Sequence, residues 1–237
     1  VRDFASLPVE PERGAKLSQF NGQIEFRDVS FAYPGANAPL LEGLSFQLPP
    51  GGIMVVTGSN GAGKPTPAKI GAGLLHPSRG QVLADGVDLH QLEPGWWRQQ
   101  LIYLPQEPTF INASLRANLE TANPEQNEET LNRIIHEVGL GRFVDESPDG
   151  LDRMLTNGGS NMALGQRRRL AFARALFVGG TLAVLDEPTE SLDEEGTACD
   201  YSALIAMARR GKTLNDLPRH AQHVRGASLI LARDRRN

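Results

Sequence analysis

The chain has one cysteine, no long apolar run and no excess of positive charge, and each absence excludes a class of protein. Cys199 stands alone among 237 residues, which excludes an internal disulfide framework and favours a reducing compartment. No segment approaches the about 18–20 consecutive apolar residues that a membrane-spanning helix needs. The formal net charge of −4 gives no general attraction for polyanions, so nucleic acid is not an expected partner.

The N-terminal segment also lacks recognisable signals. It does not begin with methionine, and it has no signal-peptide pattern of basic, apolar and small regions. Residues 1–21 contain Pro, Glu and Lys in a sequence typical of a linker. We expect this segment to be a linker and the chain to be part of a longer polypeptide.

Short apolar runs alternate with helical patterns along the rest of the chain. Apolar–polar alternation or short apolar runs predict strands at 22–35, 40–52, 53–58 and 181–188. Apolar residues at helical spacing predict helices within 115–144 and over 165–178. This order predicts an α/β core with a parallel sheet, into which a mainly helical block from about 107 to 175 is inserted.

Residues 58–66, GSNGAGKPT, follow one of these strands and resemble a phosphate-binding loop of the form G-x-x-x-x-G-K-[ST]. We expect the backbone N–H groups of this loop to surround a β-phosphate while the Lys64 ammonium reaches the β- and γ-phosphates. A simple glycine-rich turn is the alternative. The predicted nucleotide-binding residues here are Gly58, Ser59, Asn60, Gly61, Ala62, Gly63, Lys64, Pro65 and Thr66.

Two acids end the later apolar run, in LAVLDEPTESLD. Asp186, at the end of a buried strand, is the expected Mg²⁺ ligand opposite the phosphate loop. Glu187 is the expected general base for the attacking water. The alternative is a pair of solvated acids at a strand end. This alternative is a poor explanation, because a strand followed by Asp-Glu-Pro-Thr downstream of a phosphate loop is an unusual coincidence.

These ordered motifs resemble the ATPase subunits of ABC transporters, from about Gly22 to Leu231. The resemblance implies a P-loop NTPase (RecA-like) core with an N-terminal antiparallel β subdomain and an inserted helical subdomain, spanning 22–237. It also assigns further site residues. Tyr33 in FAYPG matches the aromatic that stacks on adenine, although a core tyrosine is the alternative. Gln106 in YLPQEP matches a glutamine that contacts Mg²⁺ and water and reports to the membrane domain. The signature L-S-G-G-Q corresponds to MALGQ, with Ala163, Gly165 and Gln166, and the D-loop ends at Asp193.

The segments PQEPTFINASLRANL and GLDRMLTNGGSNMALGQ are similar to the exporter branch, in which the ATPase follows a membrane domain in the same polypeptide. The resemblance implies a head-to-tail pair of ATP-binding domains, homo- or heterodimeric, with ATP between one phosphate loop and the partner's signature. Hydrolysis of Mg-ATP would drive transport, at the cytoplasmic face of the cell (inner) membrane.

The chain departs from the family pattern within its motifs. Pro65 replaces the Ser or Thr whose hydroxyl binds Mg²⁺, and it also lacks a backbone N–H. Ala163 replaces the signature serine, and Leu164 replaces a glycine.

The segment TLNDLPRHAQHV stands where the family has a buried strand that ends in a histidine contacting the γ-phosphate. Asn215 and Asp216 argue against a central strand there, because both residues are depleted in strands. Arg219 falls on the histidine position, so His220, one residue later, is the candidate, with a surface histidine as the alternative.

Three functions remain open from the sequence. The first is an active ATPase domain of an exporter, and the second is a catalytically impaired nucleotide-binding module that regulates an active partner. The third is a soluble ABC-type ATPase acting on DNA or in translation, for which the chain shows neither a long coiled-coil insert nor a second cassette.

Overall fold

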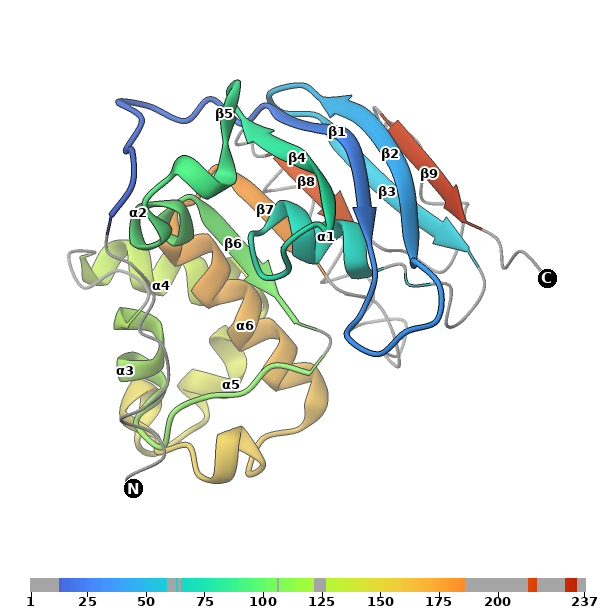
Figure 1. Cartoon of the computed structure of the whole chain (residues 1–237). Helices are drawn as coiled ribbons and strands as arrows, with labels where there is room; N and C mark the ends of the chain where they lie inside the picture. The colour runs from blue at the N-terminus through green and yellow to red at the C-terminus, as the bar shows by residue number, and fades with distance from the viewer. Residues whose placement is uncertain are drawn as a thin grey trace, which may run out of the picture.

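The computed structural model describes residues 13–58, 63, 65–105, 107–121, 127–185, 213–216 and 229–233. Two β-sheets lie side by side and a group of helices lies against one end of them (Figure 1). The strands are β1 (Ile24–Phe31), β2 (Leu41–Leu48), β3 (Ile53–Gly58), β4 (Arg79–Ala84), β5 (Val87–Asp88), β6 (Leu101–Leu104), β7 (Leu182–Leu185), β8 (Thr213–Asp216) and β9 (Leu229–Arg233). The predicted α/β architecture with an N-terminal antiparallel sheet is confirmed.

The first sheet is antiparallel, with strand order β2-β1-β4-β5. Its central strand β1 follows the predicted alternation, but with one interruption. Asp28 has a φ of 50°, and the register shifts between Phe26 and Val29. This bulge returns the next apolar residues to the buried face, so Phe26 and Val29 are both core residues, 2% and 0% exposed.

The second sheet has five strands in the order β6-β7-β8-β3-β9, and all its pairs are parallel. The expectation that Asn215 and Asp216 argue against a central strand is wrong, because β8 lies between β7 and β3. Backbone groups form this ladder on both sides, so pairing overrides the low strand propensity of a four-residue segment.

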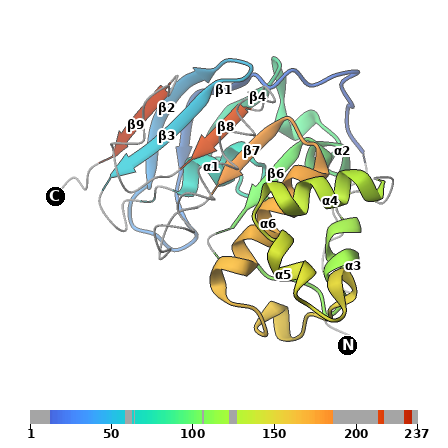
Figure 2. The ribbon, with the colours of Figure 1, turned by 180° about the vertical axis from the view of Figure 1, so that it is seen from behind.

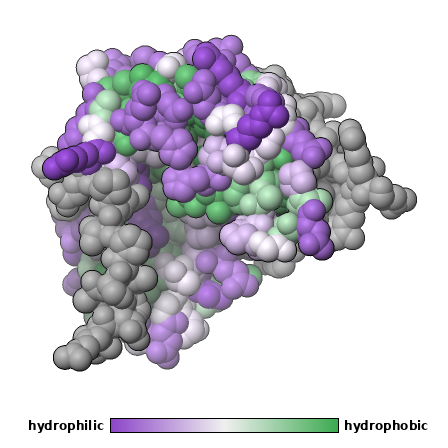
Figure 3. Space-filling model, in the orientation of Figure 1, coloured by the Kyte–Doolittle hydropathy of each residue, from purple (hydrophilic) through white to green (hydrophobic). Residues whose placement is uncertain are grey.

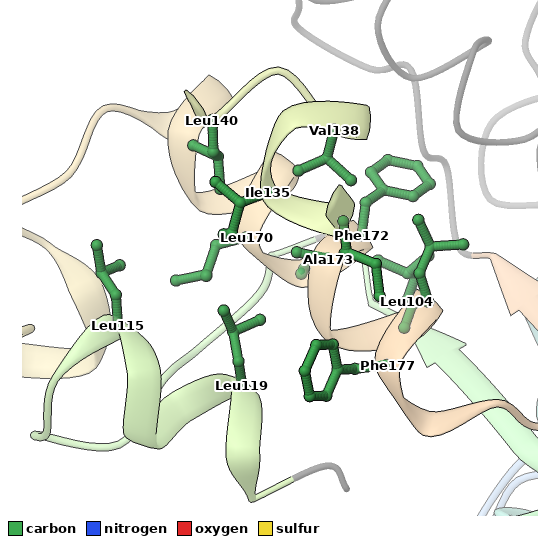
Figure 4. Close-up of a cluster of buried hydrophobic side chains, with 14 of the residues drawn as sticks. Leu104, Leu115, Leu119, Ile135, Val138, Leu140, Leu170, Phe172, Ala173 and Phe177 are labelled. Atoms are coloured by element: carbon green, nitrogen blue, oxygen red, sulfur yellow. The ribbon is translucent and has the colours of Figure 1, made fainter. Parts of the chain in front are cut away.

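The helices are α1 (Pro65–Gly71), α2 (Pro94–Gln99), α3 (Leu115–Glu120), α4 (Glu128–Glu137), α5 (Gly141–Asp145) and α6 (Leu164–Val178), with short 3₁₀ turns η2 (Leu89–Gln91), η3 (Gly150–Asp152) and η4 (Asn157–Gly159). Helix α6 packs on β6, α3 and α4, and Figure 2 shows this group from behind. Leu170 and Phe177 of α6 meet Leu119 of α3 and Ile135 of α4 in one apolar cluster (Figure 4). The spacing of apolar residues in the sequence correctly predicted this face of α6.

Helix α1 is enclosed by a second apolar cluster that contains residues of both sheets. Five of its seven residues are buried, including Thr66 and Ile70. A helix that is buried all round is fixed in place by its surroundings, since its short length gives it little stability of its own. The first turn of α1 is therefore held rigidly where β3 ends.

Residues 13–20 of the predicted linker run along η2 and α2. Ala15 donates its N–H to the carbonyl of Gln91 at 2.7 Å and accepts the N–H of Glu93 at 2.9 Å, and Phe20 packs edge-on against Trp97. A Cβ on Gly14 would lie 2.4 Å from the backbone nitrogen of Glu93, so only glycine permits this approach. Within the described ranges, no helix combines the length and apolarity needed to cross a bilayer.

Candidate nucleotide-binding site

The predicted site residues follow the carboxyl ends of neighbouring parallel strands. Strand β3 ends at Gly58, and β7 ends at Leu185, directly before Asp186. Leu104 of β6 is the register partner of Leu185, and Gln106 comes two residues after it. In open α/β sheets, ligands bind beyond these carboxyl ends.

Several of the predicted residues lie outside the described part of the chain, so their positions stay predictions. The described ones divide into a group at the start of α1 and a group at the start of α6. The residues outside are Ser59, Asn60, Gly61, Ala62, Lys64, Gln106, Asp186, Glu187, Asp193 and His220.

Gly63 occupies a position that only glycine fits. Its φ is +75°, in the left-handed region, and a Cβ on it would lie 2.7 Å from Cδ2 of Leu40. Leu40 precedes β2, so the side chain that closes on Gly63 comes from the other sheet. A phosphate loop needs such bare backbone, because its N–H groups must approach the ligand closely.

Pro65 is the first residue of α1, where proline is compatible with the helix because the first N–H has no intrahelical acceptor. The next turn closes normally, with the N–H of Thr66 donating to the carbonyl of Gly63 at 3.1 Å. The fold therefore accommodates Pro65. Its cost falls on ligand binding, since one N–H and one hydroxyl are missing from the loop.

Tyr33 lies beside this turn, although it is far from it in sequence. Its hydroxyl is 3.4 Å from Oγ1 of Thr66, and its ring packs edge-on against Phe31, with the centroids 4.9 Å apart. The side chain is 44% exposed. A half-exposed aromatic ring held by a ring contact and a hydroxyl contact suits stacking on a nucleobase, and the alternative of a core tyrosine does not fit this exposure.

The described residues fit a nucleotide better than they fit its metal ion. The left-handed backbone of Gly63 suits a phosphate, and the exposed ring of Tyr33 suits a base. The metal needs a hydroxyl that Pro65 lacks, and Thr66 is 1% exposed with its hydroxyl next to Tyr33. Thr66 therefore does not replace the missing Mg²⁺ ligand in this structure.

The second group begins α6. Ala163 is the N-cap residue, and its N–H donates to Oε1 of Gln166 at 3.1 Å, so the glutamine orients the first turn. The Ala163 methyl cannot accept a hydrogen bond, so the first N–H groups, including that of Gly165, are not capped by this side chain. The N-terminus of a 15-residue helix with uncapped N–H groups is suited to an anion.

The structure thus brings Tyr33, Gly63, Pro65 and Thr66 together at the N-terminus of α1, next to the end of β3. It places Ala163, Gly165 and Gln166 in a different part of the fold, at the N-terminal end of α6 in the helical group (Figures 1 and 2). The described candidates therefore form two separate groups in one chain.

The sequence analysis missed Asn118, which is fully buried and organises the loop after β6. Its Oδ1 accepts the N–H of Ile111 at 3.0 Å, and its Nδ2 donates to the carbonyls of Ile111 and Ser114 at 3.1 and 3.0 Å. An asparagine within an otherwise apolar helical stripe was the signal in the sequence, because buried amides need several partners.

Comparisons with known proteins agree with this architecture. The profile of a family described as "ABC transporter" matches residues 41–190. The chain is 32% identical over 212 residues to an ATP-dependent lipid A-core flippase of Chromobacterium violaceum, covering 89% of this chain and 36% of that protein. It is 31% identical over 214 residues to antigen peptide transporter 2 of Rattus norvegicus, covering 90% of this chain and 30% of that protein.

The chain spans about a third of the length of these curated relatives. Among solved structures it matches a bacterial Atm1-family ABC exporter with ATP bound, with a TM-score of 0.85 and 23% identity, covering 98% of this chain and 41% of that one. At this identity the match supports the fold.

Proposed function

This chain belongs to the ABC transporter family, and we propose that it is the ATP-binding domain of an exporter, which binds and hydrolyses ATP to drive transport across a membrane. The observation that carries the proposal is the contact between Tyr33 and Thr66, 3.4 Å between their hydroxyls. It joins the residue proposed to stack on adenine to the turn that follows the phosphate loop. A base and its phosphates could then be held together.

In the proposed reaction, the loop amides and the Lys64 ammonium hold the β- and γ-phosphates and neutralise their charge. Glu187 accepts a proton from the attacking water, and Gln106, with His220 as a further candidate, senses the γ-phosphate. Asp186 and Gln106 are the proposed Mg²⁺ ligands. Because Pro65 lacks the hydroxyl expected to bind Mg²⁺ at this position, none of these steps depends on the metal.

We propose that the site is completed by a second ATP-binding domain. Support comes from two proposed half-sites in different parts of the chain, the phosphate loop before α1 and residues 163–166 at the start of α6. Helices α1 and α6 pack in different apolar clusters. In a head-to-tail pair, the N–H groups of α6 and Asp193 would face the partner's nucleotide. Homo- and heterodimers both fit this arrangement.

The proposed membrane partner is a transmembrane domain of the same polypeptide, preceding a linker at residues 1–21 and a domain that spans 22–237 with its helical subdomain at about 107–175. Support comes from the relatives, of which this chain covers about a third. This would place the chain at the cytoplasmic face of the cell (inner) membrane.

A cavity of about 510 Å³ at the C-terminal end of α1 is the proposed docking surface for that membrane domain. Its lining includes Leu75 and Trp97, and Leu74 at its edge is 53% exposed. Figure 3 shows apolar side chains gathered near the middle of this face, in the region of α1. Residues 13–20 run along α2, which forms one wall of the cavity, so the segment that would come from the membrane domain already contacts this surface.

A second candidate function is favoured by one observation, the buried Thr66 hydroxyl beside Pro65. It is a regulatory nucleotide-binding module that pairs with an active partner and turns over ATP negligibly. ATP turnover by the full chain distinguishes the two. Turnover that Glu187→Gln abolishes supports the ATPase, and tight ATP binding without turnover supports the regulatory module.

A further inference from the structure

The ring of Phe110 connects two segments that flank the predicted site. Phe110 lies in the loop 107–114 between β6 and α3, and it is 7% exposed. A Cβ on Gly159 would lie 2.8 Å from its Cδ2 atom, and Cζ of Arg174 lies 5.4 Å from its ring centroid. The ring therefore contacts both the loop before α6 and the middle of α6.

The Gly159 side of this contact leads directly to the signature. Gly159 has a φ of +88° and ends η4, and its carbonyl accepts the N–H of Met162 at 3.0 Å. Ala163, the N-cap residue of α6, follows. A ring that packs on the bare backbone of Gly159 therefore sets the position of the turn that starts α6.

The Arg174 side is a half-buried cation. Burial lowers the pKa of its guanidinium, and the structure shows no carboxylate paired with it among the described residues. The face of Phe110 is its partner, which is an attractive but modest interaction for a desolvated cation. A half-buried charge carries a desolvation cost that a cation–π contact offsets only in part, which points to a role for Arg174 besides stability.

The other end of the loop is rigid. Asn118 holds the backbone of Ile111 and Ser114, so Phe110 is attached to a fixed unit on one side and follows the Gln106 segment on the other. Only residues 107–109 separate Phe110 from Gln106 along the chain, so the position of that segment bears on where the Phe110 ring lies.

We propose that Phe110 and Arg174 are positioning residues, which hold the signature turn 159–166 in register with the loop that follows Gln106. Their proposed role is to make the signature half-site respond to the state of that loop. The inference rests on the proposed function, because the signature has a role only in an ATP-binding domain. The contact of Phe110 with Gly159 and Arg174 does not depend on that function.

The test uses the full 237-residue chain and four variants. Arg174→Met removes the charge and keeps the apolar stem, Arg174→Lys keeps a charge, and Phe110→Leu removes the aromatic face. Arg153→Met is the matched control, because Arg153 makes a cation–π contact of the same kind, with its Cζ 4.7 Å from the ring centroid of Phe143 rather than Phe110.

Two quantities are measured for each variant, the affinity of the monomer for ATP and the ATP-driven dimerisation constant. Arg174→Met and Phe110→Leu are expected to weaken dimerisation about 2- to 30-fold, the usual range for residues that couple two sites. ATP affinity is expected to stay within about 2-fold, Arg174→Lys to restore most of the dimerisation, and Arg174→Met to melt no lower than the wild type. Arg153→Met is expected to change neither quantity.

Dimerisation of Arg174→Met that equals that of Arg153→Met, or a parallel fall in ATP affinity, would overturn the inference. Hydrogen exchange in the nucleotide-free chain separates this outcome from failure of the proposed function. If the wild type does not dimerise with ATP, exchange alone decides. Faster exchange at residues 160–167 in Arg174→Met but not in Arg153→Met supports the inference, and equal exchange in the two contradicts it.

Discussion

The hydroxyl of Tyr33 lies 3.4 Å from the hydroxyl of Thr66 and connects the end of β1 to the first turn of α1. This contact occupies the one hydroxyl that follows the phosphate loop, because Pro65 has none. It brings the base side and the phosphate side of the proposed site together. Two properties of the site therefore differ. ATP binding depends on Tyr33 and the loop backbone, which are present, whereas metal-assisted turnover depends on a hydroxyl that Pro65 lacks.

Removing the Tyr33 ring is expected to weaken ATP binding. Stacking on an aromatic ring is worth about 1–3 kcal/mol per base, so Tyr33→Ala should raise the Kd for ATP about 5- to 150-fold, as measured by calorimetry. Tyr33→Phe keeps the ring and should bind ATP nearly as well as the wild type. Equal affinities for Tyr33→Ala and the wild type would show that adenine does not stack there.

Gly63→Ala is expected to destabilise the loop for two separable reasons. A left-handed φ costs a residue with a Cβ about 1–2 kcal/mol, and the new methyl would overlap Leu40. Adding Leu40→Ala should remove the overlap but leave the backbone cost. Thermal melting with and without ATP measures both effects. Gly63→Ala should lower the melting temperature of the wild type by more than it lowers the melting temperature of Leu40→Ala. Equal decreases would mean that the steric contact with Leu40 is not formed.

Asn118→Ala is expected to lower the free energy of unfolding by about 1–3 kcal/mol, because it removes a fully buried side chain and takes the acceptor away from the Ile111 N–H. Asn161→Ala is the matched control. Asn161 also bridges two backbone segments, accepting from the N–H of Thr156 and donating to the carbonyl of Met154, but it is exposed. Its loss should cost about 1 kcal/mol or less in a urea titration. Equal losses would contradict the role of burial.

The sequence predicted elements whose side chains carry a clear period. Strand β3, the apolar stripe of α6 and the alternation within β1 form as expected. The bulge at Asp28 was not predicted, although it accommodates the three-residue spacing of Phe26 and Val29. Strand β8 was missed because its backbone pairs on both sides whatever side chains Asn215 and Asp216 carry. Propensity cannot show pairing that is imposed by neighbours.

The motifs named the candidate site residues, and the roles of these residues stay predictions. Tyr33 and Thr66 were both assigned to the nucleotide, but their mutual contact was not foreseen, because it depends on how β1 is placed against α1. The packing of Leu40 on Gly63 and of Phe110 on Gly159 was also beyond the sequence. A glycine in the sequence does not indicate which side chain packs against it in the fold.

The attachment of residues 13–20 is expected to weaken in acid. A hydrogen bond from Lys16, 3.1 Å away, lowers the pKa of Glu93, whose carboxylate also caps α2 by accepting the N–H of Trp96. A lowered folded pKa contributes stability above the unfolded value of about 4.3, and this contribution is lost as the pH falls through the folded pKa.

The melting temperature should therefore differ between wild type and Glu93→Gln at pH 7, and the difference should shrink below about pH 4. Lys16→Met should reduce the difference at pH 7. A difference that is constant with pH would show that the Glu93 carboxylate gains nothing from Lys16 in the folded chain.

The measurement that tests the account most directly is ATP affinity and turnover of the full chain and of Pro65→Thr, each with and without Mg²⁺. We expect the wild type to bind ATP and to turn it over slowly, both with little dependence on Mg²⁺, and Pro65→Thr to gain Mg²⁺-dependent affinity and faster turnover. Glu187→Gln should abolish turnover in both proteins. ATP binding by neither protein would contradict the assignment of the nucleotide site. Mg²⁺-dependent turnover by the wild type, unchanged by Pro65→Thr, would contradict the account of Pro65 as a missing metal ligand.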